Sequence, residues 1–178
     1  MQGIVSLLDG ADRERVEQIW DELRRDFGVS GIYAKRFPHF SYHIAEEYDL
    51  ARAEAALQEL APKTLPFSAH TSGIGIFTRK DPVIYVPVVR SPMLVGLHGK
   101  IAELASPLAT GVNEFYGEEI WIPHITIAEG DVDLLVLPEI MRRFGERSFR
   151  WELRVANFAL IRATEDVQEI CYRCEFKG

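Results

Sequence analysis

The alternation of apolar and polar positions along the chain predicts helices interleaved with strands. Apolar residues recur every three or four positions in segments that we expect to be helical, at about 12–27, 49–60, 92–104 and 134–144. Shorter apolar or alternating runs predict strands at about 3–8, 37–45, 66–77, 83–89, 121–128, 148–162 and 167–176. The segment 106–119, with proline, glycine and asparagine, is typical of a long loop. This mixture of helices and paired strands indicates an α+β fold.

Two segments of the chain resemble each other. The first, 37–42, has the sequence Phe-Pro-His-Phe-Ser-Tyr, and the second, 122–127, has the sequence Ile-Pro-His-Ile-Thr-Ile. A predicted helix and then a strand follow each of them at nearly the same distance. We therefore expect one β-α-β unit to be used twice. Because two similar halves usually pack about a pseudo-two-fold axis, the histidines of the two copies should point into one shared cleft.

Each copy carries the pattern Pro-His-x-(Ser/Thr). In a strand, side chains at positions i and i+2 point to the same face. His39 therefore shares a face with Ser41, and His124 shares a face with Thr126, while the residues between them point into the core. A single histidine of this kind is more often an ordinary core or surface residue. Two histidines in matching contexts favour a functional role.

This paired motif resembles that of the 2H phosphoesterase superfamily, in its 2′-5′ RNA ligase-like, cyclic phosphodiesterase branch. The resemblance implies a bilobal fold, with two antiparallel-rich sheets flanking a central cleft, helices outside, and residues 1–178 as one domain of two pseudo-symmetric lobes. It also implies hydrolysis of 2′,3′-cyclic phosphates or related phosphodiesters of nucleotides and RNA ends, with 2′-5′ ligation as the reverse reaction, and no metal or other cofactor. The serine at position 41 stands where the family more often has threonine.

The chemistry of the residues agrees with this expectation. Histidine has an ordinary pKa of about 6.5, so either ring can act as general acid or general base near neutrality. His39 and His124 are thus the candidate catalytic residues, and the sequence does not say which of them is the base. The hydroxyls of Ser41 and Thr126 can donate hydrogen bonds to the non-bridging phosphate oxygens. Neither histidine has a carboxylate or thiolate at metal-ligand spacing, so no metal site is expected.

Other residues are weaker candidates for contacting substrate. His43 lies two positions after Ser41, so simple alternation would place it on the cleft face. Arg90 and Arg162 follow apolar strands and could project into the mouth of the cleft. Tyr116 could stack on a base or close a hydrophobic cluster.

Three further residues are not expected to take part in the site. His70 also begins a His-x-Ser sequence but lacks the preceding proline, so we assign it no catalytic role. His98 is expected to be exposed on its helix, and Trp121 is expected to pack in the interior.

Composition narrows the classes of function. The chain has 20 Lys and Arg against 27 Asp and Glu, a net charge of −7, which excludes a generally basic nucleic-acid-binding surface. Its 2 cysteines, Cys171 and Cys174, exclude a disulfide framework. The absence of a long apolar run and of a signal-peptide pattern leads us to expect a cytoplasmic monomer without a membrane span.

Two alternatives to a nucleotide phosphodiesterase remain open. The same cleft could hold a nucleotide or an RNA end without turnover, as a binding module. It could also act on a phosphate ester that is not a nucleotide, because the paired motif recognises phosphate and not a base.

Overall fold

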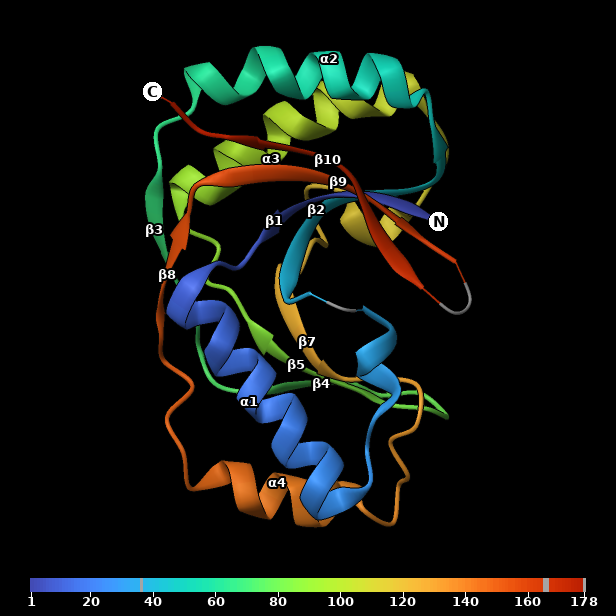
Figure 1. Cartoon of the computed structure of the whole chain (residues 1–178), viewed down its shortest axis with the longest axis vertical. Helices are drawn as coiled ribbons and strands as arrows, with labels where there is room; N and C mark the ends of the chain where they lie inside the picture. The colour runs from blue at the N-terminus through green and yellow to red at the C-terminus, as the bar shows by residue number, and fades with distance from the viewer. Residues whose placement is uncertain (36, 165–166, 178) are drawn as a thin grey trace.

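The structure is a computed structural model that describes residues 1–35, 37–164 and 167–177, in which helices and strands alternate (Figure 1). The α-helices are α1 (Gly10–Phe27), α2 (Leu50–Leu60), α3 (Pro92–Ala105) and α4 (Leu137–Gly145). The strands are β1 (Gln2–Leu7), β2 (His39–Tyr48), β3 (Phe67–His70), β4 (Gly75–Phe77), β5 (Val83–Pro87), β6 (Ala109–Val112), β7 (His124–Ala128), β8 (Glu152–Val155), β9 (Asn157–Ala163) and β10 (Gln168–Glu175). The predicted α+β class is therefore confirmed.

The strands are assembled antiparallel. Within the described part of the chain, the largest sheet has the order β10-β9-β1-β2-β6, a second has the order β4-β5-β7, and β3 pairs with β8. A bridge between Thr71 and Val88 joins the β3-β8 pair to the second sheet. The motif strands β2 and β7 belong to different sheets and lie beside each other in the middle of the molecule (Figure 1).

The two halves of the chain pair their strands in the same way. Strand β1 lies between β2 and β9, and strand β5 lies between β7 and β4. Val5 stands opposite Ser41, and Tyr85 stands opposite Thr126, so the two motifs occupy matching positions in the register. This matching register is what the similarity of the two sequence segments leads one to expect.

The first helix of each half packs on the strand of the other half. Helix α1 follows β1 in the chain but contacts β7, and α3 follows β5 but contacts β2. Figure 1 accordingly places α2 and α3 at one end of the molecule, and α1 and α4 at the other. Helix α1 buries Val16, Ile19, Trp20 and Leu23, which recur at helical spacing, and it ends at Gly28, whose positive φ of 72° gives a left-handed cap.

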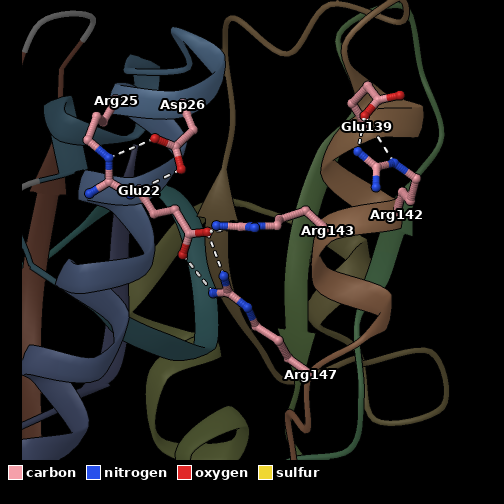
Figure 2. Close-up of polar contacts among 7 residues, drawn as sticks. All are labelled: Glu22, Arg25, Asp26, Glu139, Arg142, Arg143 and Arg147. Atoms are coloured by element: carbon pink, nitrogen blue, oxygen red, sulfur yellow. Dashed lines mark hydrogen bonds and ion pairs between the residues drawn. The ribbon is translucent and has the colours of Figure 1, made fainter.

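A partly buried ion cluster joins α1 to α4 (Figure 2). Both oxygens of Glu22 accept hydrogen bonds from Arg147, each at 2.6 Å, and Oε1 also accepts one from Arg143 at 3.2 Å. These two arginines hold the pKa of Glu22 below its ordinary value, with the hydrogen bond from Arg147 as the main cause and burial opposing it. The cluster fixes the outer helices of the two halves against each other.

Some element boundaries differ from those expected from sequence. The segment 66–77 forms two strands, because the chain turns at Ser72 and Gly73, where φ is +75°. The segment 148–162 is likewise divided at Ala156, so β8 and β9 enter different sheets. The expected loop 106–119 contains strand β6, which extends the largest sheet.

Within the described residues, no helix combines the length and apolar character that crossing a membrane would require.

Candidate functional site

The residues of both sequence motifs line one cavity of about 720 Å³. His39 and Ser41 reach it from β2, and His124 and Thr126 reach it from β7. The four side chains are partly buried, whereas the residues between them are buried in the core, with Ile125 fully inaccessible. The alternation of faces therefore places the two imidazoles and the two hydroxyls on the wall of one cavity.

Both motif histidines are anchored through the same ring nitrogen. Nδ1 of His39 lies 3.0 Å from the carbonyl oxygen of Phe37, and Nδ1 of His124 lies 2.6 Å from that of Ile122. A carbonyl oxygen can only accept a hydrogen bond, so Nδ1 of each ring carries the proton that is donated. Nε2 is then the nitrogen at which each ring can gain or lose a proton.

Aromatic rings surround His124. The Phe77 ring meets it edge-on, with centroids 5.0 Å apart, and the Tyr85 ring is tilted against it at 5.1 Å. Burial in this setting lowers the pKa of His124, while the bond to the Ile122 carbonyl and the charge of Glu129 act in the opposite direction. Burial thus favours the neutral form of the His124 ring.

A glycine makes room for this aromatic group. Tyr85 stacks on Phe77, with centroids 4.1 Å apart, and covers Gly75 on the neighbouring strand. A Cβ atom at position 75 would lie only 2.3 Å from Cζ of Tyr85. The close approach of ring and backbone at Gly75 therefore sets where Tyr85 rests against His124.

Tyr116 lies in the cavity wall beside Ser41. It belongs to the 3₁₀ turn Glu114–Tyr116, and its phenol lies near the Ser41 side chain. Burial raises the pKa of the Tyr116 phenol, and the polar interaction with Ser41 opposes that shift. The sequence left open whether Tyr116 stacks on a base or packs internally, and the structure gives it a polar contact with a motif residue instead.

The rest of the cavity wall is mainly apolar. One ion pair on this wall joins Arg79 and Glu129, 3.2 Å apart. Phe77, Arg79 and Glu129 were not among the site residues predicted from the sequence. Two signals were present, because Phe77 ends the strand that closes the first duplicated unit and Glu129 follows the second motif strand.

Three residues that were weaker candidates do not line the cavity. His43 is 2% exposed and bonds through Nδ1 to the Tyr48 hydroxyl at 2.5 Å. Its expected position is wrong because β2 carries a bulge: Ile4 pairs with His43 and Val5 with Ser41, which shifts the alternation and brings Ile44 to the cavity.

Arg90 and Arg162, the other two weaker candidates, do not line the cavity. Arg90 donates to the Glu118 carbonyl oxygen at 2.7 Å, and Arg162 pairs with Glu169 at 3.3 Å. Arg162 lies between two residues that do line the cavity, Ile161 and Ala163, so strand alternation directs it to the other face.

Of the predictions for His98 and Trp121, the first is wrong and the second is confirmed. His98 is 1% exposed, so its predicted exposure is wrong. Trp121 is fully buried, so its predicted packing is confirmed, and its ring lies parallel to that of His98 with centroids 3.9 Å apart.

Among residues 1–35, 37–164 and 167–177, no three histidine, cysteine or acidic side chains are grouped so that they could hold a metal ion. Cys171 and Cys174 are both present as thiols.

Solved structures share this fold. LigT of E. coli, in a crystal structure with 3′-AMP, superposes with a TM-score of 0.60 over 100% of both chains at 18% sequence identity. A second crystal structure, of a phosphoesterase, gives a TM-score of 0.59 over 99% of this chain and 98% of that chain, at 16% identity.

Curated relatives point to the same class of enzyme. A protein of Bacillus cereus strain B4264 that bears the name "putative phosphoesterase" is 28% identical over 137 residues, which is 75% of each chain. A protein of the same name from Bacillus thuringiensis strain Al Hakam matches to the same extent, 28% over 137 residues and 75% of each chain. These names indicate a phosphoesterase. The family model described as the 2′-5′ RNA ligase superfamily matches residues 11–167, and the chain therefore belongs to that superfamily, as the paired histidine motif led us to expect.

Proposed function

We propose that the protein hydrolyses 2′,3′-cyclic phosphates of nucleotides or RNA ends without a metal ion, with His39 and His124 as general acid and base. The observation that carries this proposal is the matched pair of imidazoles in one cavity. Each is anchored at Nδ1 by a carbonyl oxygen two residues earlier in the chain. Two rings with the same anchoring can exchange roles, as hydrolysis and its reversal require.

In the proposed reaction, one ring begins neutral and the other protonated. Nε2 of the neutral ring removes a proton from water, and the water oxygen forms a bond to phosphorus. The P–O bond to one ribose oxygen breaks, and that oxygen receives the proton from Nε2 of the protonated ring. The products are a phosphate monoester and two histidines whose protonation states have been exchanged, which solvent then restores.

The hydroxyls have a separate task in this mechanism. Negative charge stays on the non-bridging oxygens throughout the reaction and grows as water attacks. Ser41 and Thr126 lie on the same strand faces as the histidines and can donate hydrogen bonds to those oxygens.

The dimensions and polarity of the cavity favour a small substrate. Its volume of about 720 Å³ suits a mononucleotide or the end of an RNA. The mainly apolar wall and the net charge of −7 are unsuited to long stretches of phosphate backbone. We include 2′-5′ ligation of RNA ends as the reverse reaction, and we regard residues 1–178 as one domain with two pseudo-symmetric lobes that acts as a monomer.

The direct test is turnover of the four 2′,3′-cyclic nucleoside monophosphates in EDTA, with the product identified by phosphorus NMR. We expect hydrolysis to a single monoester, and a loss on the order of 10²–10⁴-fold in turnover for His39→Ala and for His124→Ala. The double variant should lose much less than the product of the two, because both rings act in one step.

His70→Ala is the matched control, since His70 is exposed and lies outside the cavity although it also begins a His-x-Ser sequence. Its turnover should equal that of the wild type. Binding of the cyclic nucleotide without turnover would instead identify a binding module. Loss of activity in EDTA that Zn²⁺ or Mn²⁺ restores would replace the two-histidine mechanism with a metal-activated water.

A further inference from the structure

The backbone at both motif hydroxyls lies at the edge of a sheet. Strand β7 is the last strand in the order β4-β5-β7, and β6 pairs with β2 only from Ala45 onward. Among the residues that the structure describes, each motif strand therefore has, at its hydroxyl residue, a paired side and a side that no neighbouring strand covers. A carbonyl oxygen on that uncovered side, buried in the interior, needs a donor from elsewhere.

An indole N–H supplies that donor in both places. Nε1 of Trp121 donates to the carbonyl oxygen of Ser41 at 2.9 Å, and Nε1 of Trp20 donates to that of Thr126 at 3.3 Å. Each tryptophan comes from the half of the chain that does not carry the motif it binds. Both are almost inaccessible, with Trp121 at 0% and Trp20 at 3% exposure.

Neighbouring rings hold both indoles in place. Trp121 lies flat against His98, whose Nε2 bonds to the Tyr116 carbonyl oxygen at 3.0 Å. Trp20 meets Tyr33 edge-on, with centroids 6.2 Å apart, and the Tyr33 hydroxyl donates to Asp21. Because the rings cannot turn without displacing these partners, each indole fixes the position of one strand edge.

We propose that Trp20 and Trp121 are positioning residues of the site, each setting the position of one motif hydroxyl through the backbone carbonyl of the same residue. Trp121 positions Ser41, and Trp20 positions Thr126. This inference rests on the proposed function, because it assigns the hydroxyls a hydrogen bond to phosphate oxygens. It predicts specific coupling: each tryptophan should affect the reaction only through its own partner.

The test is a pair of double-mutant cycles with tryptophan to phenylalanine changes, which keep an aromatic ring and remove the N–H donor. With 2′,3′-cyclic AMP as substrate, Trp121→Phe should lower kcat roughly tenfold, since small misplacements of catalytic groups are costly. In the Ser41→Ala background the same change should cost less than about twofold, because the positioned hydroxyl is already absent. In the Thr126→Ala background it should keep its full effect.

The second cycle pairs Trp20→Phe with Thr126→Ala. We expect the same pattern with a smaller loss, because this hydrogen bond is longer, 3.3 Å against 2.9 Å. If Trp121→Phe does not fold, this second cycle decides the question alone. Trp151→Phe is the matched control: Trp151 packs on Phe149 and under Arg15, away from both motifs, and its replacement should leave kcat unchanged.

If each tryptophan change lowers kcat by the same factor in the Ser41→Ala and in the Thr126→Ala background, the tryptophans act only through general stability and the proposal is overturned. The cycles are also measured with inorganic phosphate as a ligand, which separates positioning from turnover. If the wild-type protein binds phosphate and the variants show the expected coupling in their phosphate affinities, but no cyclic nucleotide is hydrolysed, the proposed function is refuted and the positioning role stands. A wild-type protein that neither binds phosphate nor turns over would overturn both.

Discussion

Replacing Gly75 with alanine should damage stability and catalysis together, through one ring. The added Cβ would lie 2.3 Å from Cζ, 2.5 Å from Cε2 and 2.6 Å from the hydroxyl oxygen of Tyr85. Carbon atoms in contact normally stand about 3.5–4.0 Å apart, so the ring must withdraw by roughly 1 Å or more. Tyr85 is 9% exposed and held between Phe77 and His124, so it cannot withdraw without displacing one of them.

The magnitude follows from overpacking. Forcing additional volume into a packed interior costs about 1–3 kcal/mol. We expect the free energy of unfolding of Gly75→Ala, measured in urea, to fall by that amount. Displacement of the His124 ring by roughly 1 Å should lower turnover of a 2′,3′-cyclic nucleotide by up to about 10²-fold.

Gly96 provides the matched control within the same protein. A Cβ at position 96, in helix α3, would meet nothing within 4 Å. Gly96→Ala should therefore stabilise the protein, by about 0.5–1 kcal/mol, because alanine favours the helix interior. Turnover should not change.

A second background isolates the clash. In Tyr85→Ala the ring atoms that Cβ would meet are absent, so adding Gly75→Ala should cost less than about 0.5 kcal/mol. If Gly75→Ala unfolds at the same urea concentration as the wild type and retains full turnover, the packing argument is wrong.

Three further outcomes are expected. Glu22→Gln should lower the free energy of unfolding at pH 7 by about 1–2 kcal/mol, a figure that is reduced because the arginines are partly exposed. This loss should vanish as the pH falls through the lowered pKa of Glu22, which chemical denaturation at several pH values would measure. Burial lowers the pKa of His43 to about 4, so as the pH falls the unfolded state takes up a proton before the folded state does, and stability should decline from about pH 6.5 to pH 4. His43→Phe should lack this part of the decline. If its dependence of stability on pH equals that of the wild type, the buried neutral ring is contradicted. Ser41→Ala and Thr126→Ala should each reduce kcat by about 10²-fold without changing the urea midpoint, whereas Ser41→Thr should retain most activity, and equal losses in Ser41→Thr and Ser41→Ala would mean that the hydroxyl is not what matters.

The sequence was most informative where local pattern and packing agree. The motif residues His39, Ser41, His124 and Thr126 could be grouped from alternation and duplication alone, because alternation relates residues two positions apart and the duplication is visible as two similar segments, 37–42 and 122–127. The α+β class followed from the same periodicities. In a regular strand, the alternation of side chains lets the sequence predict which face each residue lies on.

Alternation failed where the strand is irregular. The bulge in β2, opposite Ile4 and Val5, turned His43 into the core, and nothing in the residue types distinguishes Tyr42 or His43 as its site. His98 was misjudged for a related reason, since its helix packs on β2 of the other half and its polar ring lies against Trp121. Helical periodicity identifies an apolar face, but it does not reveal that an aromatic partner will bury a histidine beside that face.

The two indole hydrogen bonds could not be predicted from the sequence, because they join residues that are far apart in the chain. Trp20 has the spacing of a core residue of α1 and Trp121 that of a residue packed before a strand, and both are indeed buried. Their hydrogen bonds to the motif strands arise because α1 contacts β7 and the segment before β7 reaches β2. A donor separated from its acceptor by 106 or 80 positions leaves no local signal. It also follows that each half of the chain depends on the other at these positions: where no strand pairs with β2 beside Ser41 or with β7 beside Thr126, the donor to the backbone carbonyl comes from the other half.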